Sequence, residues 1–124
     1  MAILSGIPVF HCRSIEATLA FYQQMLQFVL VNKREVEGAL VWAHLMHGDT
    51  TLMLQSAEHA PGEASTPNNS NISLYFFVDN LDELHHLIKA KNHPVSAIET
   101  RDYQMREFSL NDPENNEIII GQKG

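Results

Sequence analysis

The sequence predicts an α+β protein built from two copies of one βαβββ module. The order strand, helix, three strands occurs twice, beginning near residue 7 and again near residue 72. Each helix carries apolar residues at helical spacing, whereas the flanking segments alternate or are rich in β-branched residues. A stretch rich in Ala, Pro, Gly, Ser and Asn separates the two copies. We therefore predict one domain over residues 1–124, with module one at about 5–56, a linker at about 57–70 and module two at about 71–122.

The first module opens with a strand over residues 7–12. Pro8 cannot donate to a ladder, so we expect the start of this strand to lie at an edge or to be unpaired. Ser14 is a good N-cap for a helix from about residue 15 to 26. Four apolar side chains recur at helical spacing and predict the buried face of this helix: Ile15, Leu19, Tyr22 and Leu26.

A strand over 28–31 and a polar edge or turn over 35–38 lead to the clearest hairpin, 40–47 with 50–55. Its two-residue turn is centred on Gly48-Asp49. Side chains alternate along strands, so the register implied by this turn puts three facing pairs on one side of the sheet. Those pairs are Met46 with Thr51, His44 with Met53, and Trp42 with Gln55. The other side should receive the helix.

The second module repeats this order. A strand over 72–78 places Ser73, Tyr75 and Phe77 on one face. Asn80 can cap the following helix, with Glu83 three places later as in a capping box. The apolar stripe of that helix is Leu81, Leu84, Leu87 and Ile88, and Pro94 follows its end. The remaining strands are predicted over 95–100, 106–111 and 117–121.

The last hairpin carries the strongest family resemblance. Arg106-Glu107-Phe108 leads into a turn that begins Asp112-Pro113, and Ile118-Ile119-Ile120 resumes the strand. This run resembles the C-terminal hairpin of the vicinal-oxygen-chelate superfamily, which includes glyoxalase I, extradiol dioxygenases and bleomycin-resistance proteins. Asn115 stands where the family has Gly, and Asn is the next best residue for a positive φ. The Gly that often precedes the Arg by two places is replaced by Gln104.

The resemblance covers the whole chain and implies how the modules are used. In this family the eight strands form one curved mixed sheet around a cavity, with the helices outside. Members are commonly homodimers, and in the bleomycin-binding branch the ligand pockets lie at the dimer interface. Catalytic members hold a divalent metal from four strands. Those four positions fall here on Ile7, Met53, Ser73 and Ile119.

None of these four residues is a usual ligand for a divalent metal, which favours imidazole or carboxylate. The resemblance therefore points to the metal-free branch that sequesters a planar or cationic toxic compound and confers antibiotic resistance. It predicts no cofactor and no catalytic residue. The predicted ligand-binding residues are Trp42, His44, Met53, Ser73, Tyr75, Phe77, Tyr103 and Arg106.

Other interpretations of the same residues stay open. The aromatic side chains can instead fill a core, and His44 can be a hydrogen-bonded core histidine or a general base. A register shift of two residues would offer His11, Gln55 and Glu117 as a displaced metal set. That alternative describes a metal-dependent lyase, isomerase or dioxygenase. A third possibility is a small-molecule sensor.

Composition limits the partners and the compartment. The formal net charge is −7, from 15 acidic and 8 basic residues, which argues against nucleic acid. We find no apolar run long enough to span a membrane and no signal peptide at the N-terminus, and therefore predict no membrane partner and a cytoplasmic location. The single cysteine, Cys12, excludes an internal disulfide. The predicted partners are a small-molecule ligand and a second copy of the chain.

Overall fold

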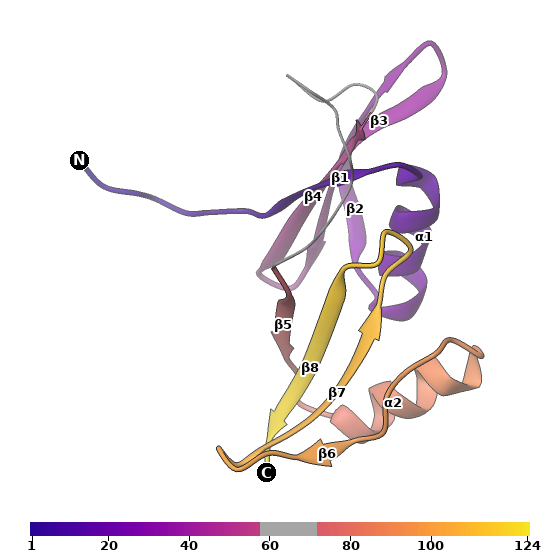
Figure 1. Ribbon diagram of the computed structural model, residues 1–124. Coiled ribbons are helices and arrows are strands. Elements are labelled where there is room, and N and C mark those ends of the chain that lie inside the picture. Colours follow the sequence, from indigo (N-terminus) through magenta and orange to yellow (C-terminus); the bar gives the residue numbers. More distant parts are fainter. Residues whose placement is uncertain (58–71) are drawn as a thin grey trace. The chain divides into compact units, whose positions relative to one another are not determined.

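The computed structural model describes residues 1–57 and 72–124, which belong to two compact units, Met1–Asn68 and Asn69–Gly124 (Figure 1). The predicted linker lies, except for Ala57, outside the described residues. Each unit contains one helix and one mixed four-stranded sheet, which confirms the predicted α+β class. The pairing of both modules into one eight-stranded sheet stays a prediction.

The first unit has the predicted order of strand, helix and three strands. Its strands lie in the sheet order β1-β4-β3-β2, with β1 parallel to β4 and the other neighbours antiparallel. Figure 1 shows α1 alongside this sheet. The elements are β1 (Val9–Cys12), α1 (Ile15–Met25), β2 (Val29–Val36), β3 (Ala39–His47) and β4 (Thr50–Ser56).

The register of the β3–β4 hairpin is the predicted one. His44 lies opposite Met53, and Trp42 lies opposite Gln55. The buried face packs on α1 and contains Val41, Ala43, Leu45, Leu52 and Leu54. We call the opposite side, which carries Trp42, His44 and Met53, the far face of unit 1.

Two local details of unit 1 differ from expectation. The strand β2 extends to Val36, because the reversal is made by Glu37 and Gly38, which both have positive φ. Ser14 occupies the N-cap position of α1, but its side chain makes no capping hydrogen bond.

The second unit repeats the topology, with the sheet order β5-β8-β7-β6 and β5 parallel to β8. Asn80 caps its helix as predicted, since the Asn80 side chain accepts a hydrogen bond from the Glu83 amide at 3.1 Å. The elements are β5 (Leu74–Phe77), α2 (Leu81–Ala90), β6 (Glu99–Thr100), β7 (Met105–Asn111) and β8 (Glu117–Lys123).

The core of unit 2 lies between α2 and the sheet, where Phe108, Leu110, Ile118 and Ile120 are buried. By alternation, the opposite side carries Tyr75, Glu107 and Gly121. We call it the far face of unit 2.

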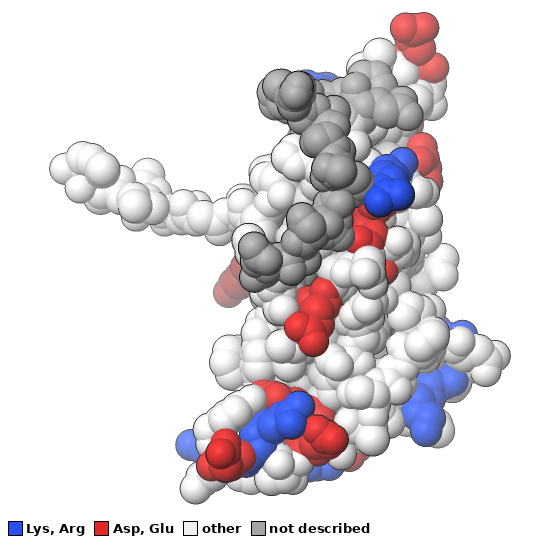
Figure 2. Space-filling model, viewed as in Figure 1, with Lys and Arg blue, Asp and Glu red and all other residues white. Residues whose placement is uncertain are grey.

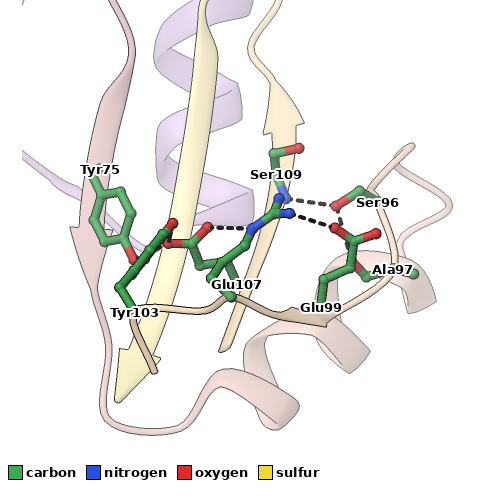
Figure 3. A network of polar contacts seen from close by, with 8 residues as sticks. Tyr75, Ser96, Ala97, Glu99, Tyr103, Glu107 and Ser109 are labelled. Carbon is green, nitrogen blue, oxygen red and sulfur yellow. Dashed lines mark hydrogen bonds and ion pairs between the residues drawn. The ribbon is translucent and has the colours of Figure 1, made fainter. Parts of the chain in front are cut away.

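The strand predicted over 95–100 is limited to Glu99–Thr100. Ser96 pairs with Ser109 through one backbone bond and one side-chain bond. Its amide donates to the Ser109 carbonyl at 2.9 Å, and its hydroxyl accepts from the Ser109 amide at 2.8 Å in place of a second backbone bond (Figure 3). Asn115 has φ 67° in the last turn, as predicted. Gln104 also adopts a positive φ, of 66°, where the family often has Gly.

Within the described ranges, no helix is both long and apolar enough to cross a membrane.

Candidate functional site

The far face of unit 1 holds three of the predicted binding residues on two neighbouring strands. Trp42 and His44 project from β3, with ring centroids 6.3 Å apart and planes tilted by 42°. Met53 lies directly opposite His44 on β4. All three side chains are half-buried, so they form a surface of rings and thioether on the side of the sheet opposite α1.

The His44 imidazole carries the unsatisfied polar atom of this face. Its Nε2 is buried and has no hydrogen-bond partner within the part of the chain that the structure describes. A buried polar atom without a partner costs about 1–3 kcal/mol, so such atoms are rare and often belong to functional sites. Asn32 is the residue beside His44 on β2, and its Oδ1 accepts from the Lys33 amide.

The far face of unit 2 is organised around one carboxylate. Glu107 is only 4% exposed. Its Oε2 accepts from the Tyr75 and Tyr103 hydroxyls, each at 2.6 Å, and its Oε1 accepts from Arg101 Nε at 3.1 Å. Arg101 Nη1 also pairs with Glu99 at 3.0 Å. We call these five residues the Glu107 cluster; Figure 3 shows them with the Ser96 contacts beside them.

The backbone of β8 makes room for this cluster. Gly121 lies opposite Glu107, and the Tyr75 ring crosses above it, so a Cβ at residue 121 would collide with the Tyr75 hydroxyl. Phe77 stands next to Tyr75 on the same face, with ring centroids 4.9 Å apart, and its side chain is 78% exposed. Glycine therefore positions Tyr75 by leaving space for it.

The electrostatics of the cluster favour a charged Glu107. Burial alone would raise the pKa of the Glu107 carboxyl, but the hydrogen bonds from Tyr103, Tyr75 and Arg101 outweigh it and hold this pKa below its usual value. Burial and the bond to Glu107 raise the pKa of Tyr75 to about 12. The same carboxylate raises the pKa of Tyr103 and of Arg101 through their hydrogen bonds to it.

Two predicted binding residues have partners outside this cluster. Arg106 projects toward α2 and forms a two-pronged ion pair with Asp82, at 2.9 and 3.1 Å. Its predicted role in ligand binding would require this pair to open. Ser73 donates from its hydroxyl to Glu117 Oε1 at 2.6 Å.

The four family metal positions do not offer a suitable donor set. Met53 and Ile119 lie within β4 and β8 and present a thioether and an alkyl group, while the Ser73 hydroxyl is bonded to Glu117. In the alternative set, His11 and Gln55 face each other across β1 and β4, whereas Glu117 belongs to unit 2. Among residues 1–57 and 72–124, no three His, Cys, Asp or Glu side chains form a group able to hold a metal ion.

Glu107 and Arg101 were not predicted from the sequence as functional residues. Strand alternation puts Arg106 and Glu107 on opposite faces of β7. The buried Phe108 and Leu110 assign Arg106 to the helix side and Glu107 to the far face. The signal that could have identified this cluster is Gly121, which faces Glu107 across β8 and β7. That pairing depends on the register of the last hairpin, which the sequence did not specify.

The fold and the module repeat are those of the glyoxalase and bleomycin-resistance class of proteins. The sequence matches the profile of the Glyoxalase/Bleomycin resistance protein/Dioxygenase superfamily over residues 9–120, and the chain belongs to this superfamily. This assignment confirms the resemblance seen in the last hairpin. A comparison with curated protein sequences finds no match.

Solved structures with the same fold include binding proteins and an enzyme. TnmS3, an antibiotic binding protein from Streptomyces sp. CB03234, is 22% identical, with a TM-score of 0.77 and coverage of 100% of this chain and 99% of that one. The bleomycin resistance determinant encoded on transposon Tn5 is 24% identical, with a TM-score of 0.73 and coverage of 96% and 97%. A lactoylglutathione lyase from Agrobacterium tumefaciens is 16% identical, with a TM-score of 0.72 and coverage of 98% and 96%.

Proposed function

We propose that this protein binds and sequesters a planar small molecule, without a metal, on the far face of unit 1. In this function Trp42 stacks on the planar part of the ligand, and Met53 supplies apolar contact beside it. His44 Nε2 forms a hydrogen bond with a polar atom of the ligand. The protein performs no chemistry on the compound, so affinity and protein concentration set the protection.

The observation that carries this proposal is the buried Nε2 of His44 beside the Trp42 ring, an atom with no hydrogen-bond partner among residues 1–57 and 72–124. A ligand that supplies the missing hydrogen bond recovers the free energy spent on burying that atom. Contact with an aromatic ring contributes about 0.5–1.5 kcal/mol beyond area burial. Together these two features select for a flat ligand with a polar atom near one edge.

The relatives support the ligand class. TnmS3 is an antibiotic binding protein and the transposon-encoded relative is a bleomycin resistance determinant. Both cover nearly the whole chain, so an antibiotic is the compound to test first. We also propose that the protein acts in the cytoplasm as a homodimer, which is the usual state of the family.

Titration with planar antibiotics, beginning with bleomycin, tests the proposal. Trp42 is the single tryptophan of the chain, so its fluorescence reports this face without a label. We expect saturable quenching by at least one compound, equal before and after treatment with EDTA. Trp42→Leu should weaken binding, measured by calorimetry, about tenfold, since an aromatic contact is replaced by an alkyl one.

Phe77→Leu tests the other far face, because it removes an exposed aromatic ring from unit 2 and leaves Trp42 in place. Binding that depends on Phe77 and not on Trp42 would contradict the proposal. A metal analysis of the purified protein separates it from the enzymatic alternative. One divalent ion per chain, lost together with ligand binding on EDTA treatment, would overturn it.

A further inference from the structure

The Glu107 cluster holds more negative than positive charge. Glu99 and Glu107 share a single guanidinium, that of Arg101, and both phenols that contact Glu107 are protonated at neutral pH. Glu117 and Lys123 lie on the same face of β8, so the acidic groups on this face still outnumber the basic ones by three to two. The far face of unit 2 can therefore accept another cation on electrostatic grounds.

The shape of the cluster already fits a planar cation. The Arg101 guanidinium spans two carboxylates, with Nε 3.1 Å from Glu107 and Nη1 3.0 Å from Glu99. Such fork geometry is selective for flat, delocalised cations with several N–H donors. The Tyr75 and Tyr103 hydroxyls bond to the same carboxylate, and the Phe77 ring lies beside Tyr75, so aromatic rings, which attract cations, adjoin the cluster.

The groups that cover Glu107 are themselves on the surface. The Arg101 side chain is 47% exposed and Tyr103 is 59% exposed, and both come from the turn before β7. In the view of Figure 2, basic and acidic residues adjoin at the lower end, where Figure 1 places β6 and the start of β7. Arg101 can leave Glu107 by side-chain rotation, because Glu99 and solvent remain available to its guanidinium.

We propose that the Glu107 cluster is a binding subsite for an amidinium or guanidinium group, and that Arg101 is the resident cation which such a group displaces from Glu107. This inference rests on the proposed role in small-molecule binding and names a cationic group that unit 2 recognises. The incoming group donates to Glu107 Oε1, while the Tyr75 and Tyr103 hydroxyls keep their bonds to Oε2.

Benzamidine and benzamide provide the test, because they have nearly the same shape and differ in charge. Nuclear magnetic resonance titration should show benzamidine shifting the amides of residues around Glu107, with no such shift for benzamide. Arg101→Gln removes the competing cation and should tighten benzamidine binding by about threefold to tenfold. Glu107→Gln keeps an acceptor for the tyrosines and should weaken it by about tenfold or more, as expected for a lost charged hydrogen bond.

Asp82→Asn is the matched control, since Asp82 is a carboxylate of the same unit that pairs with Arg106 toward α2. It lowers the net negative charge equally and should leave benzamidine affinity unchanged. Unfolding curves establish that each variant is folded. If Glu107→Gln does not fold, Arg101→Gln still tests the subsite. If Arg101 has only a structural role, its replacement should not tighten benzamidine binding.

Equal binding of benzamide and benzamidine, or weaker benzamidine binding in Arg101→Gln, would overturn the subsite. The outcome is independent of the Trp42 titration. If an antibiotic quenches Trp42 fluorescence but benzamidine does not bind near Glu107, only the proposed subsite is ruled out. If benzamidine binds near Glu107 but no compound quenches Trp42, the subsite stands and the proposed function of the far face of unit 1 is ruled out.

Discussion

Trp42 and Glu107 occupy matching places in the two units. The resemblance makes Met53 and Ile119 equivalent, and two residues further along β4 and β8 stand Gln55 and Gly121. Trp42 faces Gln55 in unit 1, and Glu107 faces Gly121 in unit 2. The same position on the same strand order therefore carries a neutral ring in one unit and a buried carboxylate in the other.

The surroundings of these two residues differ in how completely their polar atoms are satisfied. Glu107 receives three hydrogen bonds, from the Tyr75 and Tyr103 hydroxyls and from Arg101. Next to Trp42, the buried Nε2 of His44 has no partner within the described residues. A polar cluster whose hydrogen bonds are all made rigidifies a sheet, and only a competing charged group can displace its members. An unsatisfied buried atom instead favours any ligand that forms a hydrogen bond with it. One backbone plan thus supports two kinds of surface.

Gly121→Ala should have the largest effect, because it attacks the packing of unit 2 directly. The new Cβ collides with the Tyr75 hydroxyl, so the ring must move away from Glu107. Overpacking and the lost hydrogen bond to a buried carboxylate together should lower the free energy of unfolding by about 2–5 kcal/mol. Urea denaturation followed by circular dichroism measures the change.

The equivalent change in unit 1, Gln55→Ala, is the control. Gln55 Nε2 donates to the Val41 carbonyl at 3.2 Å, so about 1 kcal/mol is expected for its loss. In a Tyr75→Ala background, Gly121→Ala should be nearly neutral, because the colliding ring is gone. Full stability of Gly121→Ala in the wild-type background would mean that Tyr75 does not lie over β8.

Tyr75→Phe should have the next largest effect, and its size should depend on pH. Removing one donor to the buried Glu107 should lower the free energy of unfolding by about 1–2 kcal/mol at neutral pH. Because folding raises the pKa of Tyr75 to about 12, the stability from its hydroxyl is complete below the unfolded value of about 10. It is lost as the pH rises through about 12. The gap between wild type and Tyr75→Phe should therefore shrink across that range, and a gap independent of pH would exclude the bond to Glu107.

Local chemistry made much of the fold predictable. The Gly48-Asp49 turn fixes the β3–β4 register because a two-residue loop allows one closing pair, and the predicted pairs are the observed ones. Asn80 was predicted as a side-chain N-cap and Asn115 as a turn residue with positive φ, and both behave as expected. These features depend on residues close together in sequence.

The Glu107 cluster depends on distant residues and could not be predicted in the same way. Tyr75 comes from β5, 32 positions before Glu107, and reaches it only because residue 121 is glycine. The short β6 likewise follows from the Ser96 hydroxyl bonding across to Ser109, a side-chain choice that strand propensity does not encode. Alternation placed His44 on the correct face, but whether its ring nitrogen finds a partner is decided by all surrounding elements.

The N-caps of the two helices offer a smaller test of the comparison. Asn80 accepts from the Glu83 amide at 3.1 Å, whereas the Ser14 side chain makes no capping hydrogen bond to α1. Asn80→Ala should therefore lower the free energy of unfolding by about 1 kcal/mol. Ser14→Ala should lower it by less. A larger loss for Ser14→Ala, measured by thermal denaturation under the same conditions, would reverse the expected order.

His44→Leu should have the smallest effect on stability, and the opposite sign. The substitution removes a buried polar atom that has no partner in the described part of the chain, so the free energy of unfolding should stay unchanged or rise by up to about 1 kcal/mol. His47→Leu on the same strand is the matched control. The His47 Nδ1 contacts the Leu26 carbonyl at 3.0 Å just after α1, and losing that bond should cost about 1 kcal/mol. If His44 contacts the ligand, His44→Leu should also weaken the binding detected by Trp42 fluorescence, whereas His47→Leu should not. A His44→Leu protein that unfolds more easily and binds as tightly as wild type would show that His44 belongs to the core and would remove the distinction drawn between the two far faces.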